Sequence, residues 1–100
     1  RRQRQMCIRD RFKARLTQIG KQYGIFTEVR GIGLLIGCVL SDAFKGRAKD
    51  VFNAAEKENL MILQAGPDVV RFAPSLVVEE ADINEGLDRF ERAVKTLTQA

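Results

Sequence analysis

The run LLIGCVL at residues 34–40 constrains the fold most, because it holds seven successive residues that are apolar or glycine. A run of this length is typical of a strand inside a sheet that is covered on both faces, and it is far too short to cross a membrane. Upstream, residues 25–32 are also extended in pattern, and Gly31 and Gly33 predict a bend between two strand segments. RGIGLLIG is not a dinucleotide fingerprint, since Ile36 stands where the third glycine is needed.

Apolar residues recur at helical spacing in three other segments. Their members are Phe12, Leu16, Ile19 and Tyr23, then Ala48, Val51, Phe52 and Ala55, and finally Ile83, Leu87, Phe90, Val94 and Leu97. Gly24 predicts the end of the first helix, and residues 60–63 and 69–72 predict two short strands joined by a turn at 65–68. The chain is therefore expected to be α+β, with a small, mostly antiparallel sheet flanked by helices.

The formal net charge of +4 lies entirely in the first eleven residues, RRQRQMCIRDR. Residues 12–100 carry equal numbers of acidic and basic side chains. The codons that MCIRDR and the preceding RQ allow match a transposon end used as a sequencing adaptor. We predict that residues 1–11 are non-native and that the true N-terminus is missing. A basic arm for phosphate or RNA and an ordinary helical face are the alternatives, but the domain proper is not basic, which argues against a nucleic-acid partner.

The residue types present exclude several chemistries. Histidine is absent, and Cys7 and Cys38 match no metal-ligand spacing, which excludes Ser-His-Asp, Cys-His and His-metal sites. Cys38 lies within an apolar run, so we expect a buried, inert thiol. The lysines expected on charged, solvated helix faces, unsuited to a Schiff base, are Lys13, Lys21, Lys45, Lys49, Lys57 and Lys95. The sequence shows neither a membrane span nor a secretory signal, so a cytoplasmic location is expected.

Arg71 is the one permanent cation within the strand-like run VVRFAPSL at residues 69–76. Alternation places Val70 and Phe72 on one face of the strand and Arg71 on the other. Burial of an unpaired guanidinium is costly, so Arg71 must meet an anion or reach water. Spacing alone leaves two candidates for that anion, a neighbouring acidic side chain and a bound carboxylate. Glu28 and Arg30 share one strand face, where we expect solvated side chains that pair with each other or across the sheet.

Residues 12–100 resemble, from end to end, the C-terminal small domain of class III pyridoxal-phosphate (PLP) aminotransferases. The resemblance rests on YGIFTEVRGIGLLIGCVL and on AGPDVVRFAPSLVVEEADINEGLDRF, with a helix between them. It is strongest to the acetylornithine and succinylornithine aminotransferase branch. The fold that it implies, the small domain of a fold-type I PLP aminotransferase, agrees with the α+β arrangement expected from the residue pattern.

The resemblance also implies a function. In the family, the arginine of the RFAPSL-like stretch faces the active site and binds a substrate carboxylate, a role that passes to Arg71. The intact protein would be a PLP-dependent homodimer that moves an amino group from N-acetylornithine or N-succinylornithine to 2-oxoglutarate. The residues that hold PLP lie upstream in relatives and are absent here, so the chain alone is expected to be inactive. Any apolar face that meets the large domain would be left exposed, so the chain alone is also expected to be marginally stable or aggregation-prone. No catalytic, cofactor-binding or metal-binding residue is assigned to it, and a stand-alone anion-binding or regulatory module is the alternative.

Overall fold

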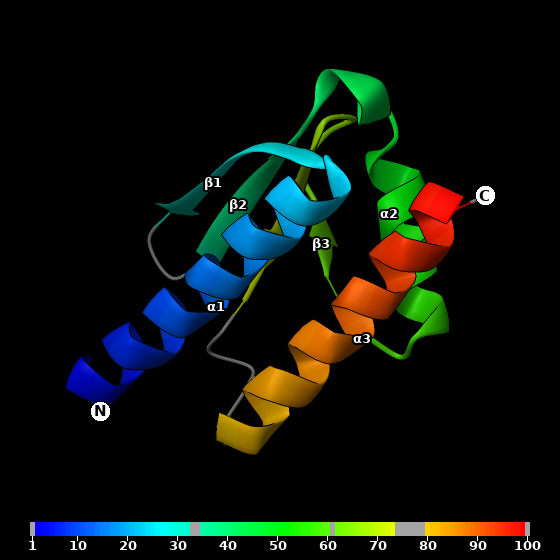
Figure 1. Ribbon diagram of the computed structural model, residues 1–100. Helices are drawn as coiled ribbons and strands as arrows, with labels where there is room; N and C mark the ends of the chain where they lie inside the picture. The colour runs from blue at the N-terminus through cyan, green and yellow to red at the C-terminus, as the bar shows by residue number, and fades with distance from the viewer. Residues whose placement is uncertain (1, 33–34, 61, 74–79, 100) are drawn as a thin grey trace.

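The computed structural model of the protein describes residues 2–32, 35–60, 62–73 and 80–99. Within these ranges the chain forms α1 (Arg2–Tyr23), β1 (Phe26–Ile32), β2 (Leu35–Leu40), the short 3-10 helix η1 (Asp42–Phe44), α2 (Ala48–Lys57), β3 (Leu63–Gln64), β4 (Val69–Phe72) and α3 (Glu80–Gln99). Figure 1 shows the helices packed beside one small sheet. The α+β prediction is confirmed. None of the described helices is long and apolar enough to span a membrane.

The sheet has the strand order β1-β2-β4-β3, and every described pairing is antiparallel. The apolar run at residues 34–40 supplies β2, which lies between β1 and β4 as an interior strand should. Ile36 pairs with Phe72, and Cys38 pairs with Val70. Only one face of β2 is fully buried, however, since Leu35 and Val39 on the other face are half-buried. The expectation of cover on both faces is therefore not met by the described residues.

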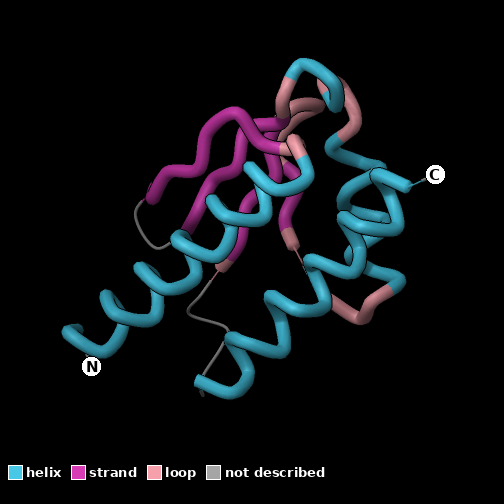
Figure 2. Tube along the Cα trace, in the orientation of Figure 1, coloured by secondary structure: helices cyan, strands magenta, loops and turns pink. Residues whose placement is uncertain are grey.

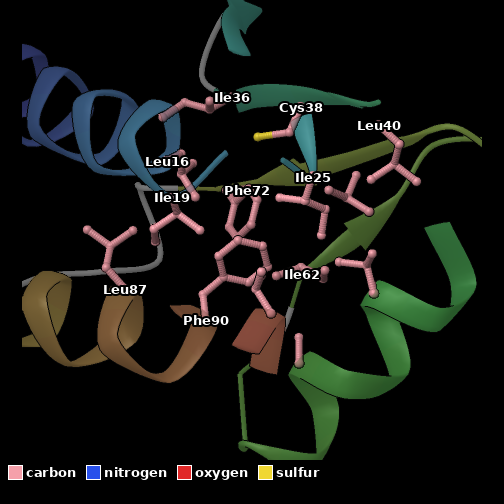
Figure 3. Packing of buried hydrophobic residues seen from close by; sticks show 14 of the residues in the cluster. Leu16, Ile19, Ile25, Ile36, Cys38, Leu40, Ile62, Phe72, Leu87 and Phe90 are labelled. Atoms are coloured by element: carbon pink, nitrogen blue, oxygen red, sulfur yellow. The ribbon is translucent and has the colours of Figure 1, made fainter. Parts of the chain in front are cut away.

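Helices and sheet form two layers around one hydrophobic cluster (Figures 2 and 3). The cluster consists of Phe12, Leu16, Ile19, Ile25, Ile36, Cys38, Leu40, Phe44, Ala48, Val51, Ala55, Ile62, Val70, Phe72, Ile83, Leu87, Phe90 and Val94. All three α-helices contribute to it, and β2 and β4 contribute their alternate residues. The residues predicted for the buried helix faces are thus largely confirmed, although Tyr23, Phe52 and Leu97 are only partly buried.

Two helices end in the same way, on a residue with a left-handed backbone. After α1, Gly24 has φ 64°, and the amide of Ile25 donates to the carbonyl oxygen of Gly20 at 3.1 Å. After α2, Asn59 has φ 60°, and the amide of Leu60 donates to Ala55 at 3.0 Å. Both are Schellman ends, for which glycine and asparagine are favoured. The second corrects the strand predicted at residues 60–63, because the chain first closes the helix and the strand is confined to Leu63–Gln64.

Helix α1 begins at Arg2, so residues 2–11 continue the helix whose apolar face was predicted from Phe12 onwards. The guanidinium of Arg9 lies against Gly31 of β1, close enough that a β-carbon at Gly31 would overlap it. Residues 2–11 are therefore compatible with the fold. Their non-native origin remains a prediction.

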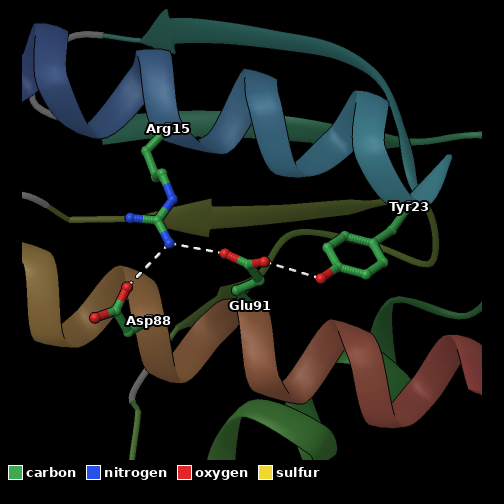
Figure 4. A network of polar contacts seen from close by, with 4 residues as sticks. All are labelled: Arg15, Tyr23, Asp88 and Glu91. Atoms are coloured by element: carbon green, nitrogen blue, oxygen red, sulfur yellow. Dashed lines mark hydrogen bonds and ion pairs between the residues drawn. The ribbon is translucent and has the colours of Figure 1, made fainter.

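A polar network links α1 to α3 (Figure 4). Arg15 donates to Glu91 at 2.7 Å and to Asp88 at 2.9 Å, and the hydroxyl of Tyr23 donates to the second oxygen of Glu91 at 2.9 Å. These bonds to Arg15 and Tyr23 lower the pKa of Glu91, because they stabilise its ionised form. The network fixes how the two helices lie against each other outside the apolar core.

Candidate anion-binding site

Strand β4 determines where Arg71 points. Val70 and Phe72 are buried in the core, and the residues between and before them, Arg71 and Val69, are half-buried on the other face. Because strand side chains alternate, anchoring Phe72 among the helices directs Arg71 away from them. The predicted alternation is confirmed.

The face that carries Arg71 is called the open face here. Its described members are Glu28 and Arg30 of β1, Leu35, Gly37 and Val39 of β2, Leu63 of β3, and Val69 and Arg71 of β4. Register places Arg30, Gly37, Arg71 and Leu63 in one row across all four strands. Gly37 thus lies between the two arginines in this row, and it is itself buried.

Arg71 has an unsatisfied donor. Its Nε is buried and has no hydrogen-bond partner within the described ranges of the chain. A buried donor of a charged group without a partner costs about 1–3 kcal/mol or more. The acidic neighbour weighed from spacing is not observed, since Arg71 forms no ion pair with any residue that the structure describes. An incoming carboxylate can accept from Nε and a terminal nitrogen together, in the bidentate geometry that guanidinium favours.

Glu28 and Arg30 pair with each other on the open face, which was one of the two predicted arrangements. The distance from Arg30 Nη1 to Glu28 Oε2 is 3.1 Å, and the side chains are 59% and 50% exposed. An ion pair this exposed contributes about 0–1 kcal/mol. It is therefore easily exchanged for another partner.

The remaining predicted residues lie away from the open face. Cys38 is buried in the core, as predicted, and burial raises the pKa of its thiol far above the ordinary value, which disfavours the reactive thiolate. All six lysines named above are exposed. Within the described ranges there is no group of three or more His, Cys, Asp or Glu residues placed to hold a metal ion.

Comparison with known proteins gives the family. The model of the Aminotransferase class-III family matches residues 2–94. The chain belongs to the class III aminotransferases. Acetylornithine aminotransferase of Pseudomonas putida is 76% identical over 90 residues, which are 90% of this chain and 22% of that protein. Succinylornithine transaminase/acetylornithine aminotransferase of Pseudomonas aeruginosa is 66% identical over 90 residues, which again are 90% of this chain and 22% of that protein. The chain thus spans about a fifth of the curated relatives' length.

Solved structures agree with this assignment. N-acetylornithine aminotransferase from Stenotrophomonas maltophilia superposes with a TM-score of 0.86 at 38% identity, covering 93% of this chain and 26% of that one. Ornithine aminotransferase from Toxoplasma gondii, at 20% identity and a TM-score of 0.80, shares the fold over 96% of this chain and 23% of its own. The described α+β unit is therefore a fold found in PLP aminotransferases of fold type I. Class III aminotransferases depend on PLP.

The sequence indicated Arg71 as a candidate anion-binding residue, but it did not reveal the residues that lie beside Arg71 in the row across the sheet. Alternation assigns a residue to one face of its own strand, but it does not reveal which residue of another strand lies beside it. The signal that was available is Gly37, a glycine inside an apolar strand, which often marks the close approach of a ligand or backbone.

Proposed function

We propose that this chain is the C-terminal small domain of an aminotransferase that moves an amino group from N-acetylornithine or N-succinylornithine to 2-oxoglutarate. Arg71 binds a substrate carboxylate in that reaction. The intact protein is a cytoplasmic PLP-dependent homodimer, and residues 12–100 form the domain. The observation that carries the assignment of Arg71 is its buried Nε, which has no hydrogen-bond partner among the residues that the structure describes.

The chemistry of transamination fits such a residue. Amino donor and oxo-acid acceptor both bring a carboxylate to the same place, and a fixed guanidinium orients each of them in turn. Arg71 lies on a strand whose next residue is packed in the core, and this fixes the face of the sheet from which its side chain extends. The names of the relatives, which include both acetylornithine and succinylornithine, support this donor class without separating the two.

We assign no PLP-holding residue to the described part of the chain. PLP is held in such enzymes by a lysine in a sheltered setting, whereas the six lysines at positions 13, 21, 45, 49, 57 and 95 are exposed. The role proposed for this chain is therefore limited to holding and orienting a carboxylate. Alone, it is expected to be inactive.

A chimera tests the proposal. The aligned C-terminal segment of the Pseudomonas putida acetylornithine aminotransferase is replaced by this chain, and amino transfer from N-acetylornithine to 2-oxoglutarate is measured. We expect activity, with kcat/KM lowered about 10- to 100-fold by Arg71→Ala, because a hydrogen bond to a charged group is worth about 1.5–3 kcal/mol. Arg71→Lys keeps the charge but loses the bidentate geometry, so its kcat/KM should lie between that of the parent chimera and that of Arg71→Ala.

Arg92→Gln is the matched control. Arg92 is an arginine of α3 that pairs with Glu58 at 3.1 Å and is 57% exposed, so its loss should leave kcat/KM unchanged. PLP absorbance of each variant shows that the chimera is folded and loaded. A loaded chimera in which Arg71→Ala retains full kcat/KM would overturn the role of Arg71.

The domain assignment has a separate test. Long unfragmented source DNA is sequenced across the junction between Arg11 and Phe12. A reading frame that continues upstream into a PLP-lysine domain supports the proposal. A genuine start codon followed by the basic arm would instead make the chain a stand-alone anion-binding module.

A further inference from the structure

Gly37 of β2 lies in the row that crosses the sheet, and it is buried. Its neighbours along the strand, Ile36 and Cys38, are buried in the core, so position 37 belongs to the open face. Glycine inside a strand has no side chain to pack, and it often marks the close approach of another group. Because Gly37 cannot cover its own backbone, another group must lie across it.

Arg71 is the neighbour in the row whose burial matches this cover. On the β1 side of Gly37, Arg30 is 59% exposed and pairs with Glu28 of its own strand. On the β4 side, Arg71 is half-buried and its Nε is buried. The described helices pack against the opposite face of the sheet, so an Arg71 side chain that stood upright would carry its Nε away from them. The buried Nε therefore indicates a side chain that lies low, along the sheet.

Leu63 of β3 indicates the direction in which the Arg71 side chain lies. The row places Arg71 between Gly37 of β2 and Leu63 of β3. The β3 side is occupied by the leucine side chain, which is 46% exposed and so has little cover. The β2 side has no side chain at this position, yet it is buried. Both observations agree with a methylene stem of Arg71 that crosses β2 over Gly37.

We propose that Gly37 is a positioning residue for Arg71. The missing β-carbon at position 37 lets the stem of Arg71 lie across β2, and this fixes the height and direction at which the guanidinium meets a carboxylate. The inference rests on the proposed role of Arg71 and extends it. Opposed β-carbons of neighbouring antiparallel strands lie about 4.5–5.5 Å apart, so a methyl group at position 37 would occupy the path of the stem. It would raise the guanidinium and displace the bound carboxylate from the reacting atoms.

The chimera with the Pseudomonas putida enzyme tests this role. Gly37→Ala is expected to lower kcat/KM for 2-oxoglutarate about 5- to 30-fold, because a misplacement of about 1 Å in a reacting complex can cost as much as about 100-fold. Gly86→Ala is the matched control, since it adds the same methyl group in α3, 3.8 Å from Leu60, and should leave kcat/KM unchanged. PLP absorbance and thermal unfolding show that each variant is loaded and folded.

Leu63→Ala is a second variant, at an exposed position whose substitution does not endanger folding. It opens the β3 side of Arg71, so the side chain gains another arrangement that must be given up on binding. We expect kcat/KM to fall about twofold to fivefold. Should Gly37→Ala fail to fold, an unchanged kcat/KM in Leu63→Ala would overturn the positioning role by itself.

A double-mutant cycle separates positioning from a merely structural effect. In an Arg71→Ala background, Gly37→Ala should not lower kcat/KM further, because the side chain that Gly37 positions is gone. An equal loss in both backgrounds would overturn the positioning role, and so would a loaded Gly37→Ala chimera as active as the parent. In either case the role of Arg71 would stand. If Arg71→Ala itself retains full kcat/KM, the proposed function fails and this inference fails with it.

Discussion

Phe72 of β4 packs edge-on against Phe90 of α3, with ring centroids 4.9 Å apart and ring planes at 82°. Phe90 also stacks on Phe26 of β1 at 6.0 Å, and Phe12 of α1 packs against Phe72 at 5.8 Å. Phe90 thus joins β1 and β4 to α3, and Figure 3 shows its ring beside that of Phe72. Because Phe72 directly follows Arg71, this aromatic group also fixes the face on which Arg71 lies.

Removing the ring of Phe90 should therefore destabilise the protein strongly. Phe90 is fully buried, and Phe90→Ala is expected to lower the free energy of unfolding by about 3–5 kcal/mol through lost burial and a residual cavity. Urea unfolding followed by circular dichroism measures the loss. Phe52→Ala, at a partly buried position of α2, is the control and should cost clearly less. Equal losses at the two positions would contradict a core centred on Phe90.

The link between α1 and α3 predicts a dependence on pH. The pKa of Glu91 is lowered in the folded protein, chiefly by the hydrogen bond from Arg15 and then by that from Tyr23. Its contribution to stability is therefore complete above the ordinary glutamate pKa of 4.5 and is lost as the pH falls through the folded pKa. Glu91→Gln should cost about 1 kcal/mol at neutral pH and nothing once the carboxylate of the parent protein is protonated.

Unfolding free energies measured between neutral pH and pH 3 or so test this dependence. Glu85→Gln is the control, because Glu85 is 62% exposed and pairs only across one turn of α3 with Arg89. Its loss is expected to change stability by about 0.3–0.5 kcal/mol. A Glu91→Gln variant whose stability runs parallel to that of the parent over the whole range would show that the network contributes nothing.

Cys38 should resist thiol reagents in the folded protein. It is buried, and its pKa is raised by that burial, so the reactive thiolate is scarce. In a Cys7→Ser background, we expect labelling by a maleimide or a disulfide reagent only at the rate at which the protein opens, and rapid labelling in urea. Fast labelling without denaturant would mean that the sheet does not protect this position.

The sequence anticipated elements that are defined by their own residues. The helix faces follow from apolar spacing, and the strand at Val69–Phe72 follows from its run of apolar residues. Arg71 is conspicuous as a single charged residue within that strand. What escaped prediction depends on partners distant in sequence. The row through Arg30, Gly37 and Arg71 requires the strand register, and the displacement of β3 to Leu63–Gln64 follows from a helix end at Asn59. Burial of one face of β2 only was missed because an apolar run does not show what covers it.

Gly20 and Gly86 offer a last, opposed pair of predictions. Both lie inside α-helices, where replacing glycine by alanine ordinarily stabilises by about 1 kcal/mol. A β-carbon on Gly20 would lie 2.9 Å from Cβ and 3.0 Å from Cδ2 of Phe26, whose backbone is fixed in β1. A β-carbon on Gly86 would meet Leu60 at an ordinary 3.8 Å.

The two substitutions should therefore have opposite signs. Gly86→Ala is expected to raise the free energy of unfolding by about 0.5–1 kcal/mol, since propensity is gained without a clash. Gly20→Ala should lower it by about 1–3 kcal/mol, because α1 must move away from β1 to make room. Parallel urea unfolding curves measure both. If Gly20→Ala stabilises as much as Gly86→Ala, then α1 packs less closely on Phe26 than the 2.9 Å contact indicates, and the helix layer holds β1 less firmly.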